Sequence, residues 1–433
     1  MMRRFYTCCF YLLLPVIFLR LWYKGRKLPA YRRRWLQRLG WVKIPKEYQH
    51  GLWIHAASVG EAVAASMLVK TLREQGDKRP IVMTTMTPTG SEQVQRSLAG
   101  DEVYHVFVPY DLPCAVRRFL DSVQPKVLIL IETEVWPNLL AEAKHYDIPC
   151  VLVNARLSAR SAAGYQRLKG FSRWMMRQFD VILAQTRADA ERFIQLGAHS
   201  ERVKICGNVK YDLSWPESLA KDAVNLRRVF GETRPVVTVA STHKGEEELI
   251  LRAFEIIWQT LDVVLVLVPR HPNRFAEVKK LCIKTGKAFA CRSDGDDNSK
   301  HPDQEQQVQL YLGDSMGEMG LYYQVADITV VAGSFQPIGG HNMLEPASLG
   351  KAVITGPHVF NFTQVAQLLA DANAAIKLAE ASDSQHLAGC IMELLSDPDK
   401  YTAMGGRGQA VVKKHQGASL ATLDEIRKVM KSR

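Results

Sequence analysis

The sequence predicts an α/β protein built from two doubly wound domains, in which parallel strands alternate with helices. After residue 50, short and continuously apolar stretches alternate with longer amphipathic ones, as expected for parallel strands that helices cover on both faces. A polar stretch, NVKYDLSWPESLAKD (208–222), divides this series into two similar halves. The chain has 433 residues, 47% of them hydrophobic, and is therefore long enough to bury two cores.

Residues 1–46 are expected to form an apolar membrane anchor followed by a basic juxtamembrane segment. The stretch FYTCCFYLLLPVIFL (5–19) precedes an aromatic pair, Trp22-Tyr23, and a run of cations. Residues 1–46 contain twelve Lys and Arg and no acid, so they hold the whole net charge of +12 and the rest of the chain is neutral. Aromatic residues beside cations are typical of an anchor at anionic lipid, where each cation contributes about 1 kcal/mol.

The positive charge of this segment places it on the cytoplasmic face of the membrane. No small-residue cleavage site follows the apolar stretch, which disfavours a cleaved signal peptide. The stretch is short for a comfortable bilayer span. It therefore either spans the bilayer or lies in its interface, and the sequence leaves both open.

The first domain is expected at residues 47–212. An apolar run at 52–54 is followed by an alanine-rich helical segment. Six further strands are expected at 81–86, 103–108, 127–131, 150–153, 181–184 and 203–206. Because ligands bind at the carboxyl ends of strands in doubly wound folds, functional residues are sought in the loops that follow these strands.

The second domain is expected at residues 235–412, after a linker region at 213–234, and Pro235 opens it. Its strands are expected at 236–240, 263–268, 308–312, 328–332 and 352–355. A C-terminal helix is expected at 413–433, and the sequence does not say where it docks.

Several classes of function lose support. The eight cysteines include no CxxC pair, the twelve histidines are scattered, and no metal-ligand spacing is present, so we expect neither a metal nor a cofactor. No GxGxxG follows the first strand and no GxxxxGK[ST] is present, which disfavours a nicotinamide enzyme and a P-loop NTPase. The neutral body carries no excess of basic charge, so we expect no nucleic-acid partner.

The stretch HAASVGEAVAAS (55–66) holds one acid, Glu61, between the apolar run and the helix. Ser58 and Glu61 have the spacing of a capping box, with the Ser58 hydroxyl accepting from the N–H of residue 61 and the carboxylate accepting from the N–H of residue 58. Alternatively, Glu61 lies at the rim of the sheet and accepts a proton from a substrate. A cap in the empty protein and a base with substrate bound are compatible roles.

Other loops of the first half carry hydroxyl and charged groups. TTMTPTGSE (84–92) is rich in hydroxyls and contains its own candidate N-cap. LIETEVWPNLL (130–140) ends a buried strand with two acids, of which Glu132 at the strand end is the better site candidate and Glu134 is expected to be solvated or structural. Arg156 and Arg160 suit a phosphorylated acceptor. Lys210 reaches the cleft or is an exposed lysine.

Three loops of the second half suit an anionic ligand. In VPRHPNRF (268–275), Arg270 either binds a phosphate or carboxylate or is solvated. LGDSMGEMGLYYQVAD (312–327) places a turn before a helix. Either the exposed N–H groups of this turn bind an anion, or Asp314 or Ser315 simply caps the helix. In AGSFQPIGGHNMLEPASLGKAV (332–353), paired glycines allow close approach of a ligand and Glu345 suits ribose hydroxyls. Alternatively, the segment is a glycine turn with Glu345 solvated. Together the three loops predict a nucleotide-sugar donor site.

At this point the sequence closely resembles the 3-deoxy-D-manno-octulosonic acid (Kdo) transferases of Gram-negative lipid A assembly. The resemblance covers nearly the whole chain. It rests on the segments KGRKLPAYRRRW, SVGE, TTMTPTGSE, PYDLP, ETEVWPNLL, NARLSARSAAGY, VPRHPNRF, GDSMGE and GGHNMLEPA, which occur in this order. The resemblance implies the GT-B architecture, which is two facing Rossmann-like domains with a cleft between them. It also implies metal-independent catalysis at the inner membrane.

The resemblance further implies a role for particular residues. Glu61 corresponds to the proton acceptor, and Glu132 and Lys210 correspond to residues that support the transition state. The positions that correspond to contacts with the CMP of the donor are Pro269, Arg270, Met316, Gly317, Glu318, Asn342, Met343, Leu344 and Glu345.

The expected activity is inverting transfer of Kdo from CMP-Kdo to the 6′-hydroxyl of the tetra-acylated lipid A precursor (lipid IVA), in lipopolysaccharide core biosynthesis. The expected partners are thus CMP-Kdo, lipid IVA and the anionic lipids of the inner membrane. The sequence does not set the number of Kdo residues added, the acyl pattern accepted or the oligomeric state. Two rivals are a lipid glycosyltransferase that uses a UDP-sugar and a non-catalytic membrane-tethered scaffold.

Overall fold

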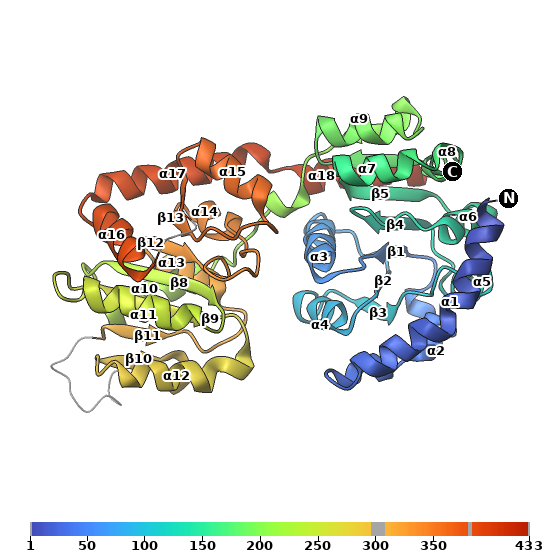
Figure 1. The fold of residues 1–433 in the computed structure, drawn as a ribbon. Helices are drawn as coiled ribbons and strands as arrows, with labels where there is room; N and C mark the ends of the chain where they lie inside the picture. The colour runs from blue at the N-terminus through green and yellow to red at the C-terminus, as the bar shows by residue number, and fades with distance from the viewer. Residues whose placement is uncertain (1, 296–307, 380–382, 432–433) are drawn as a thin grey trace. The chain divides into compact units, whose positions relative to one another are not determined.

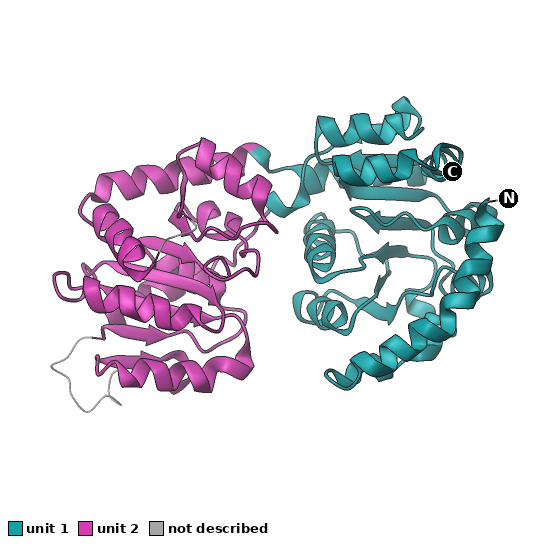
Figure 2. Ribbon diagram, in the orientation of Figure 1, with its two compact units in different colours: residues 1–212, 415–433 teal, residues 213–414 magenta. Residues whose placement is uncertain are grey.

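The protein is described by a computed structural model that covers residues 2–295, 308–379 and 383–431. The chain divides into two compact units (Figure 2): unit 1 comprises Met1–Asp212 and His415–Arg433, and unit 2 comprises Leu213–Lys414. Each unit contains one seven-stranded sheet whose paired strands are all parallel, with helices on both faces (Figure 1). The predicted fold class, two doubly wound α/β units, is confirmed.

The sheet of unit 1 has the strand order β3-β2-β1-β4-β5-β6-β7. Its strands are β1 (Leu52–His55), β2 (Ile81–Thr85), β3 (Val103–Phe107), β4 (Val127–Ile131), β5 (Cys150–Ala155), β6 (Val181–Ala184) and β7 (Val203–Ile205). All residues of β1, β2, β4, β5 and β6 are buried, which explains why these runs are apolar without alternation. The strand order reverses between β1 and β4, the position where doubly wound sheets bind ligands.

The helices of unit 1 cover both faces of this sheet. They are α1 (Met2–Lys24), η1 (Pro29–Arg32), α2 (Trp35–Arg38), η2 (Lys46–Tyr48), α3 (Val59–Glu74), α4 (Pro88–Ser97), α5 (Pro113–Val123), α6 (Pro137–His145), α7 (Ala159–Gln166), α8 (Lys169–Met176), α9 (Arg187–Gln195), η3 (Ser200–Arg202), η4 (Val209–Tyr211) and α18 (Ala418–Lys431). Thr87 caps α4 by accepting a hydrogen bond from the N–H of Gly90 (3.1 Å), as TTMTPTGSE predicts. By length and composition, α1 is the one helix of the described residues that could cross a membrane.

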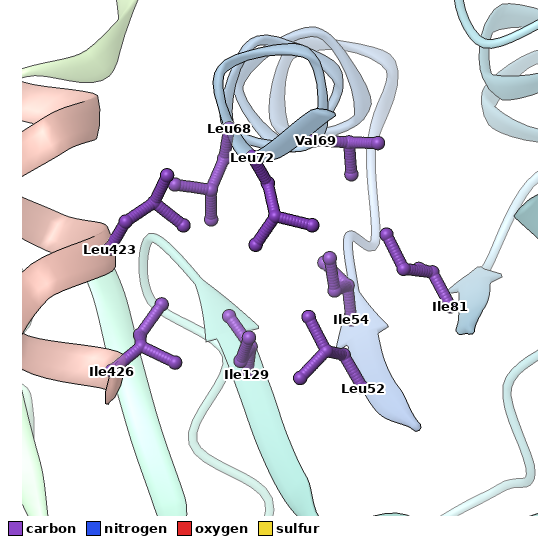
Figure 3. Close-up of a pocket in the computed structure, with 9 residues that line it drawn as sticks. All are labelled: Leu52, Ile54, Leu68, Val69, Leu72, Ile81, Ile129, Leu423 and Ile426. Atoms are coloured by element: carbon purple, nitrogen blue, oxygen red, sulfur yellow. The ribbon is translucent and has the colours of Figure 1, made fainter. Parts of the chain in front are cut away.

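The C-terminal helix α18 belongs to unit 1. Asp212 caps its start, because its carboxylate accepts from the N–H groups of Gly417 (2.6 Å) and Ser419 (2.5 Å). Figure 3 shows Leu423 and Ile426 of α18 directed at an apolar space that α3 and the strands β1, β2 and β4 also line. The last helix is therefore part of the core that supports α3.

The sheet of unit 2 has the order β10-β11-β9-β8-β12-β13-β14. Its strands are β8 (Val236–Thr242), β9 (Val264–Pro269), β10 (Phe289–Cys291), β11 (Leu310–Leu312), β12 (Ile328–Val331), β13 (Ala352–Thr355) and β14 (Ala375–Lys377). The edge strands β10 and β14 are absent from the sequence prediction, and each has only three residues. The order reverses between β8 and β12, which predicts a ligand site there.

Helices also cover both faces of this second sheet. They are α10 (Leu219–Phe230), α11 (Glu246–Ile257), η5 (Pro272–Arg274), α12 (Phe275–Lys284), η6 (Arg292–Asp294), α13 (Met319–Val325), α14 (Leu344–Ser348), α15 (Thr363–Asp371), α16 (Ser384–Leu395) and α17 (Pro398–His415). Apolar clusters lie on each side of the sheet, one centred on α11 and α16 and the other on α10 and α13.

Candidate active site

Glu61 lies in the first turn of α3, directly after β1 and thus at the reversal point of the first sheet. The hydroxyl of Ser58 accepts from the N–H of Glu61 (3.3 Å), as the capping box predicts. The return bonds differ from the prediction. Oε1 accepts from the Ser58 hydroxyl (2.8 Å) and Oε2 from the N–H of Ala57 (2.7 Å), so the N–H of residue 58 is not the donor. Two donors thus hold the carboxylate in one orientation.

The surroundings of Glu61 make it a stronger base than a free glutamate. The residue is only 9% exposed. Burial raises the pKa of Glu61, and the negative charge of Glu134 raises it further, while the hydrogen bonds from Ala57 and Ser58 act in the opposite direction. A carboxylate whose pKa is raised toward the working pH is suited to accept a proton from a substrate.

Glu134 is held in place rather than free in solvent. Its Oε2 accepts a hydrogen bond from the indole Nε1 of Trp136 (2.6 Å) and lies 3.6 Å from Nε2 of the fully buried His55. The His55 ring meets the Trp136 ring edge to face, and its Nδ1 lies 3.0 Å from the Thr84 hydroxyl. The structural interpretation of Glu134 therefore holds, and the connection to Glu61 is one that sequence reasoning missed.

Glu132 and Lys210 form an ion pair at the same edge of the sheet. Glu132 follows β4, and its Oε1 lies 2.7 Å from the Nζ of Lys210, which belongs to η4. A Cβ atom placed on Gly60 would lie 3.9 Å from that Nζ, so the ammonium lies beside the first turn of α3. The structure thus brings Glu61, Glu132 and Lys210 to one edge. Arg156 lies 4.0 Å from Glu132 and is more than half exposed.

The backbone at this edge is strained. Glu132 directly follows β4, and Asn154 is the last residue but one of the neighbouring strand β5. Both have positive φ, at 62° and 54°. Such values are uncommon outside glycine and persist where surrounding contacts enforce them. Here the N–H of Glu132 donates to Val153 (2.9 Å), and the Asn154 side chain accepts from Val209 (3.2 Å). Strained residues of this kind cluster at functional sites.

In unit 2, the predicted donor residues follow neighbouring strands. Pro269 is the last residue of β9, and Arg270 follows it. Residues 316–318 follow β11, and residues 342–345 come after β12. Since β11, β9, β8 and β12 are adjacent in that order and parallel strands end at one edge, all three loops belong to the carboxyl edge of the second sheet. Met343 and Leu344 are buried, with 0% and 2% of their surface exposed.

Glu345 lies in the first turn of α14. Burial raises its pKa, whereas a hydrogen bond from Nδ2 of Asn342 (3.1 Å) and the positive charge of Arg270 lower it. The same Asn342 accepts from the N–H of Leu344 (3.1 Å) and so begins the helix. The solvated interpretation of Glu345 does not apply, because its carboxylate is oriented by Asn342 and near Arg270.

Glu318 precedes α13 and pairs with Arg292 at 2.7 Å, which lowers the pKa of Glu318. Neither Asp314 nor Ser315 caps α13: Asp314 accepts from Ser293 and Ser315 shares a hydrogen bond with Tyr322. The predicted N-cap by Asp314 or Ser315 is therefore wrong, because both side chains form hydrogen bonds with other residues. Gly317 has φ of 88°, Met316 is 40% exposed, and both leave backbone groups accessible.

Three histidines surround Arg270, and sequence reasoning missed all of them. Nε2 of His243 and Nε2 of His341 are 2.8 Å apart, and the His271 ring packs edge to face on His243. Burial, followed by the charge of Arg270 or of a neighbouring histidine, lowers the pKa of His341 to about 3 and that of His243 to about 4. Each histidine comes after the end of a strand, and this position in the sequence could have marked it as a site candidate. The pair is neutral at pH 7, so the positive charge near it comes from arginines, Arg270 and Arg274.

Within the ranges that the structure covers, no group of three or more His, Cys, Asp or Glu side chains is arranged to hold a metal ion. The apolar space in Figure 3 lies in the core of unit 1 and is lined by aliphatic side chains alone. None of the candidate residues lines it, so it is not the site.

Comparison with known proteins gives consistent results. The sequence model of a family described as 3-deoxy-D-manno-octulosonic-acid transferase (kdotransferase) matches residues 33–213. The 3-deoxy-D-manno-octulosonic acid transferase of Haemophilus influenzae is 38% identical over 431 residues, 99% of this chain and 98% of the relative. The enzyme of that name from Bordetella pertussis is 35% identical over 439 residues, 98% of each chain.

Among solved structures, Anabaena HepE in complex with UDP resembles this chain with a TM-score of 0.54 and 15% identity. The match covers 88% of this chain and 100% of HepE. At this level of identity the likeness concerns the fold alone.

Proposed function

The chain belongs to the family of the 3-deoxy-D-manno-octulosonic acid transferases, and on this premise we propose that it moves Kdo from CMP-Kdo onto lipid IVA with inversion. The acceptor group is the 6′-hydroxyl of the distal glucosamine. The observation that carries the proposal is the oriented, largely buried carboxylate of Glu61 at the sheet edge that also carries the Lys210–Glu132 pair.

Glu61 acts as the proton acceptor. Its two bound donors occupy two of the roughly four lone-pair positions of a carboxylate, so the cap and the base are compatible. As the acceptor oxygen forms its bond to the anomeric carbon of Kdo, the bond from that carbon to the CMP phosphate breaks and the hydroxyl proton passes to Glu61. Base catalysis of this kind contributes about 10²–10⁴-fold.

Lys210 offsets negative charge during this step. Its ammonium is already positioned by Glu132 and is suited to stabilise charge on the leaving phosphate or on the Kdo carboxylate. Glu132 itself acts through Lys210, because its carboxylate fixes where the ammonium points. Preorganised charge of this type is often the largest contribution to catalysis.

The carboxyl edge of the second sheet binds CMP-Kdo. Arg270 supplies the positive charge for the phosphate, Glu345 accepts from ribose hydroxyls, and the backbone at the exposed Gly317 contacts the nucleotide. The histidines around Arg270 are neutral and therefore add no positive charge that would compete with its guanidinium. The residues 1–46, with their cations, hold the protein on the cytoplasmic face of the inner membrane.

The experiment that tests this proposal is mass spectrometry of the products that the purified full chain forms from CMP-Kdo and lipid IVA. A mass increase by one or more Kdo residues supports it and counts the additions. A parallel competition of CMP against UDP for the free protein separates the proposal from a UDP-sugar enzyme. Absence of any Kdo product, or tighter binding of UDP, would contradict it.

A further inference from the structure

One side of helix α1 is docked on unit 1 along the whole helix. The residues of that side are half-buried: Arg3, Tyr6, Thr7, Phe10, Leu14, Ile17, Phe18 and Leu21. They recur at the spacing of one helical face. Figure 1 shows the helix running past α6 and α5 toward α2. The segment is therefore a fixed part of unit 1 rather than a free tether.

The docked side binds residues at the carboxyl edge of the first sheet. Thr7 donates to Oδ1 of Asn138 (3.1 Å), and the rings of Phe10 and Phe18 pack on Tyr110 with centroids 6.1 and 5.9 Å apart. Tyr110 follows β3, and Asn138 is the second residue of α6, which follows β4. Glu61 and Glu132 lie at this same edge, so α1 is fixed to the edge that carries the candidate catalytic groups.

The opposite side of α1 is apolar and uncovered. Its exposed residues include Phe5, Leu12, Val16, Leu19 and Tyr23, with Leu12 80% exposed. At 100° per residue these positions fall within one narrow sector, opposite the docked side. A contiguous row of exposed apolar side chains on a protein surface marks an interaction surface.

Cations line the end of this stripe. The guanidinium groups of Arg26 and Arg32 lie 5.0 and 4.9 Å from the ring of Trp22, and residues 1–46 hold twelve cations without an acid. Aromatic rings beside Arg and Lys are typical of the lipid headgroup region. The chemistry that complements this surface is thus an anionic lipid bilayer.

A spanning orientation conflicts with the docked side. A helix of 23 residues is about 34 Å long, close to the thickness of the hydrocarbon core. If α1 crossed the bilayer, the groups that it contacts along its length would enter lipid with it. These include Glu142, which pairs with Arg3 (3.5 Å) and Arg117 (2.7 Å), and burying such charges in hydrocarbon is costly.

We propose that α1 lies in the plane of the cytoplasmic leaflet, with the stripe of Phe5, Leu12, Val16 and Leu19 in the lipid, and that it holds the carboxyl edge of the first sheet at the membrane surface. The partner is an anionic bilayer. Only the purpose of this orientation rests on the proposed function: it lets the hydroxyl of a lipid acceptor approach Glu61 without leaving the membrane.

Depth measurements along α1 test the orientation. Single cysteines at positions 5, 12, 16 and 19 carry nitroxide labels in the full chain, bound to vesicles of phosphatidylethanolamine and phosphatidylglycerol. The five native cysteines that are not buried (Cys8, Cys9, Cys114, Cys206 and Cys390) are first replaced by serine, and circular dichroism confirms folding. We expect equal depths of about 5–10 Å at the four positions. A profile that is deepest at position 12 and shallow at 5 and 19 would overturn the proposal.

Substitutions on the two sides of α1 provide the matched control. The outer variant Leu12→Ser/Val16→Ser/Leu19→Ser is expected to weaken flotation with the anionic vesicles about a hundredfold or more. The inner variant Leu14→Ala/Ile17→Ala is expected to float normally but to transfer less Kdo to acceptor in vesicles. Normal flotation of the outer variant would overturn the proposal.

The two proposals fail separately. Uniform depth of the labelled variants together with no Kdo product from the wild-type protein would contradict the proposed function and leave the orientation standing. Kdo product from the wild-type protein together with a spanning depth profile of the labelled variants would contradict the orientation and leave the proposed function standing.

Discussion

The Nζ atom of Lys210 lies 2.7 Å from Oε1 of Glu132, although 78 positions separate the two residues in the sequence. The contact forms because Glu132 leaves β4 with a positive φ while η4 returns the chain to the same edge. Its result is a positioned ammonium near Gly60, in the same first turn of α3 that carries Glu61.

Replacing Lys210 should impair transfer without unfolding the protein. We expect Lys210→Met to lower kcat about 10²–10³-fold, because one preorganised charge at a reacting centre contributes about this much. CMP affinity should change little, since the candidate CMP residues lie on the other sheet. Steady-state kinetics and nucleotide titration measure the two quantities. Lys204→Met is the matched control, because Lys204 also pairs with a glutamate, Glu425, in unit 1. Equal losses in both variants would contradict a role for Lys210 in the reaction.

Much of the fold was predictable because buried parallel strands leave a strong signal. The runs at 127–131, 181–184 and 352–355 coincide with β4, β6 and β13. Strands β10 and β14 escaped because each has only three residues and its apolar run is short, at 288–291 and 374–376. Phe289 is half-buried and Lys377 is exposed. The order of the strands, and with it the reversal point at β1 and β4, follows from long-range pairing that no local pattern encodes.

The site was predictable where one residue and its neighbours in sequence define the feature. Ser58 and Glu61 are three positions apart, so the cap could be predicted. The groups that donate hydrogen bonds to the Glu61 carboxylate, however, are the N–H of Ala57 and the hydroxyl of Ser58. The meeting of His243 with His341 could not, because 98 positions separate them and only the packing of β8 beside β12 joins them.

Removing the charge of Glu134 should shift the pH dependence of the reaction. The negative charge of Glu134 raises the pKa of Glu61, so Glu134→Gln should lower it. Because the deprotonated form of Glu61 is the active one, the acidic limb of the profile of kcat/KM against pH should move to lower pH. The profile of Glu74→Gln, an exposed residue at the end of α3, should match the wild type. A shift of the Glu134→Gln limb to higher pH would contradict the proposed coupling.

A buried ion pair should support the donor loop of unit 2. Arg274 lies 2.5 Å from Oε1 of the fully buried Glu247, which also accepts from Thr242 (2.8 Å). Arg274→Met leaves that carboxylate unpaired and should cost about 3–5 kcal/mol of unfolding free energy. Because Arg274 closes the turn that begins after Arg270, CMP affinity should also fall. Denaturant unfolding and CMP titration measure these effects.

The double variant Arg274→Met/Glu247→Gln should recover part of the lost stability, because the uncompensated charge is gone. Arg252→Met changes an exposed arginine of α11 and should have little effect. If Arg274→Met were as stable as the wild type, the pair would not hold this loop.

Substitution of Glu61 separates its two roles. In Glu61→Gln the side-chain carbonyl can still accept from Ser58 or Ala57, but the amide group that replaces the second oxygen can only donate, so one of the two hydrogen bonds is lost. We expect a loss of about 1 kcal/mol in stability and a fall of about 10²–10⁴ in kcat, since an amide does not accept the proton of the acceptor hydroxyl. Unfolding curves and single-turnover rates measure the two effects, with Glu74→Gln as the control for a charge change on the same helix. CMP affinity should stay at the wild-type value. Because a cap alone would affect stability and leave turnover intact, near-normal turnover in Glu61→Gln would assign this residue to the helix and remove it from the reaction.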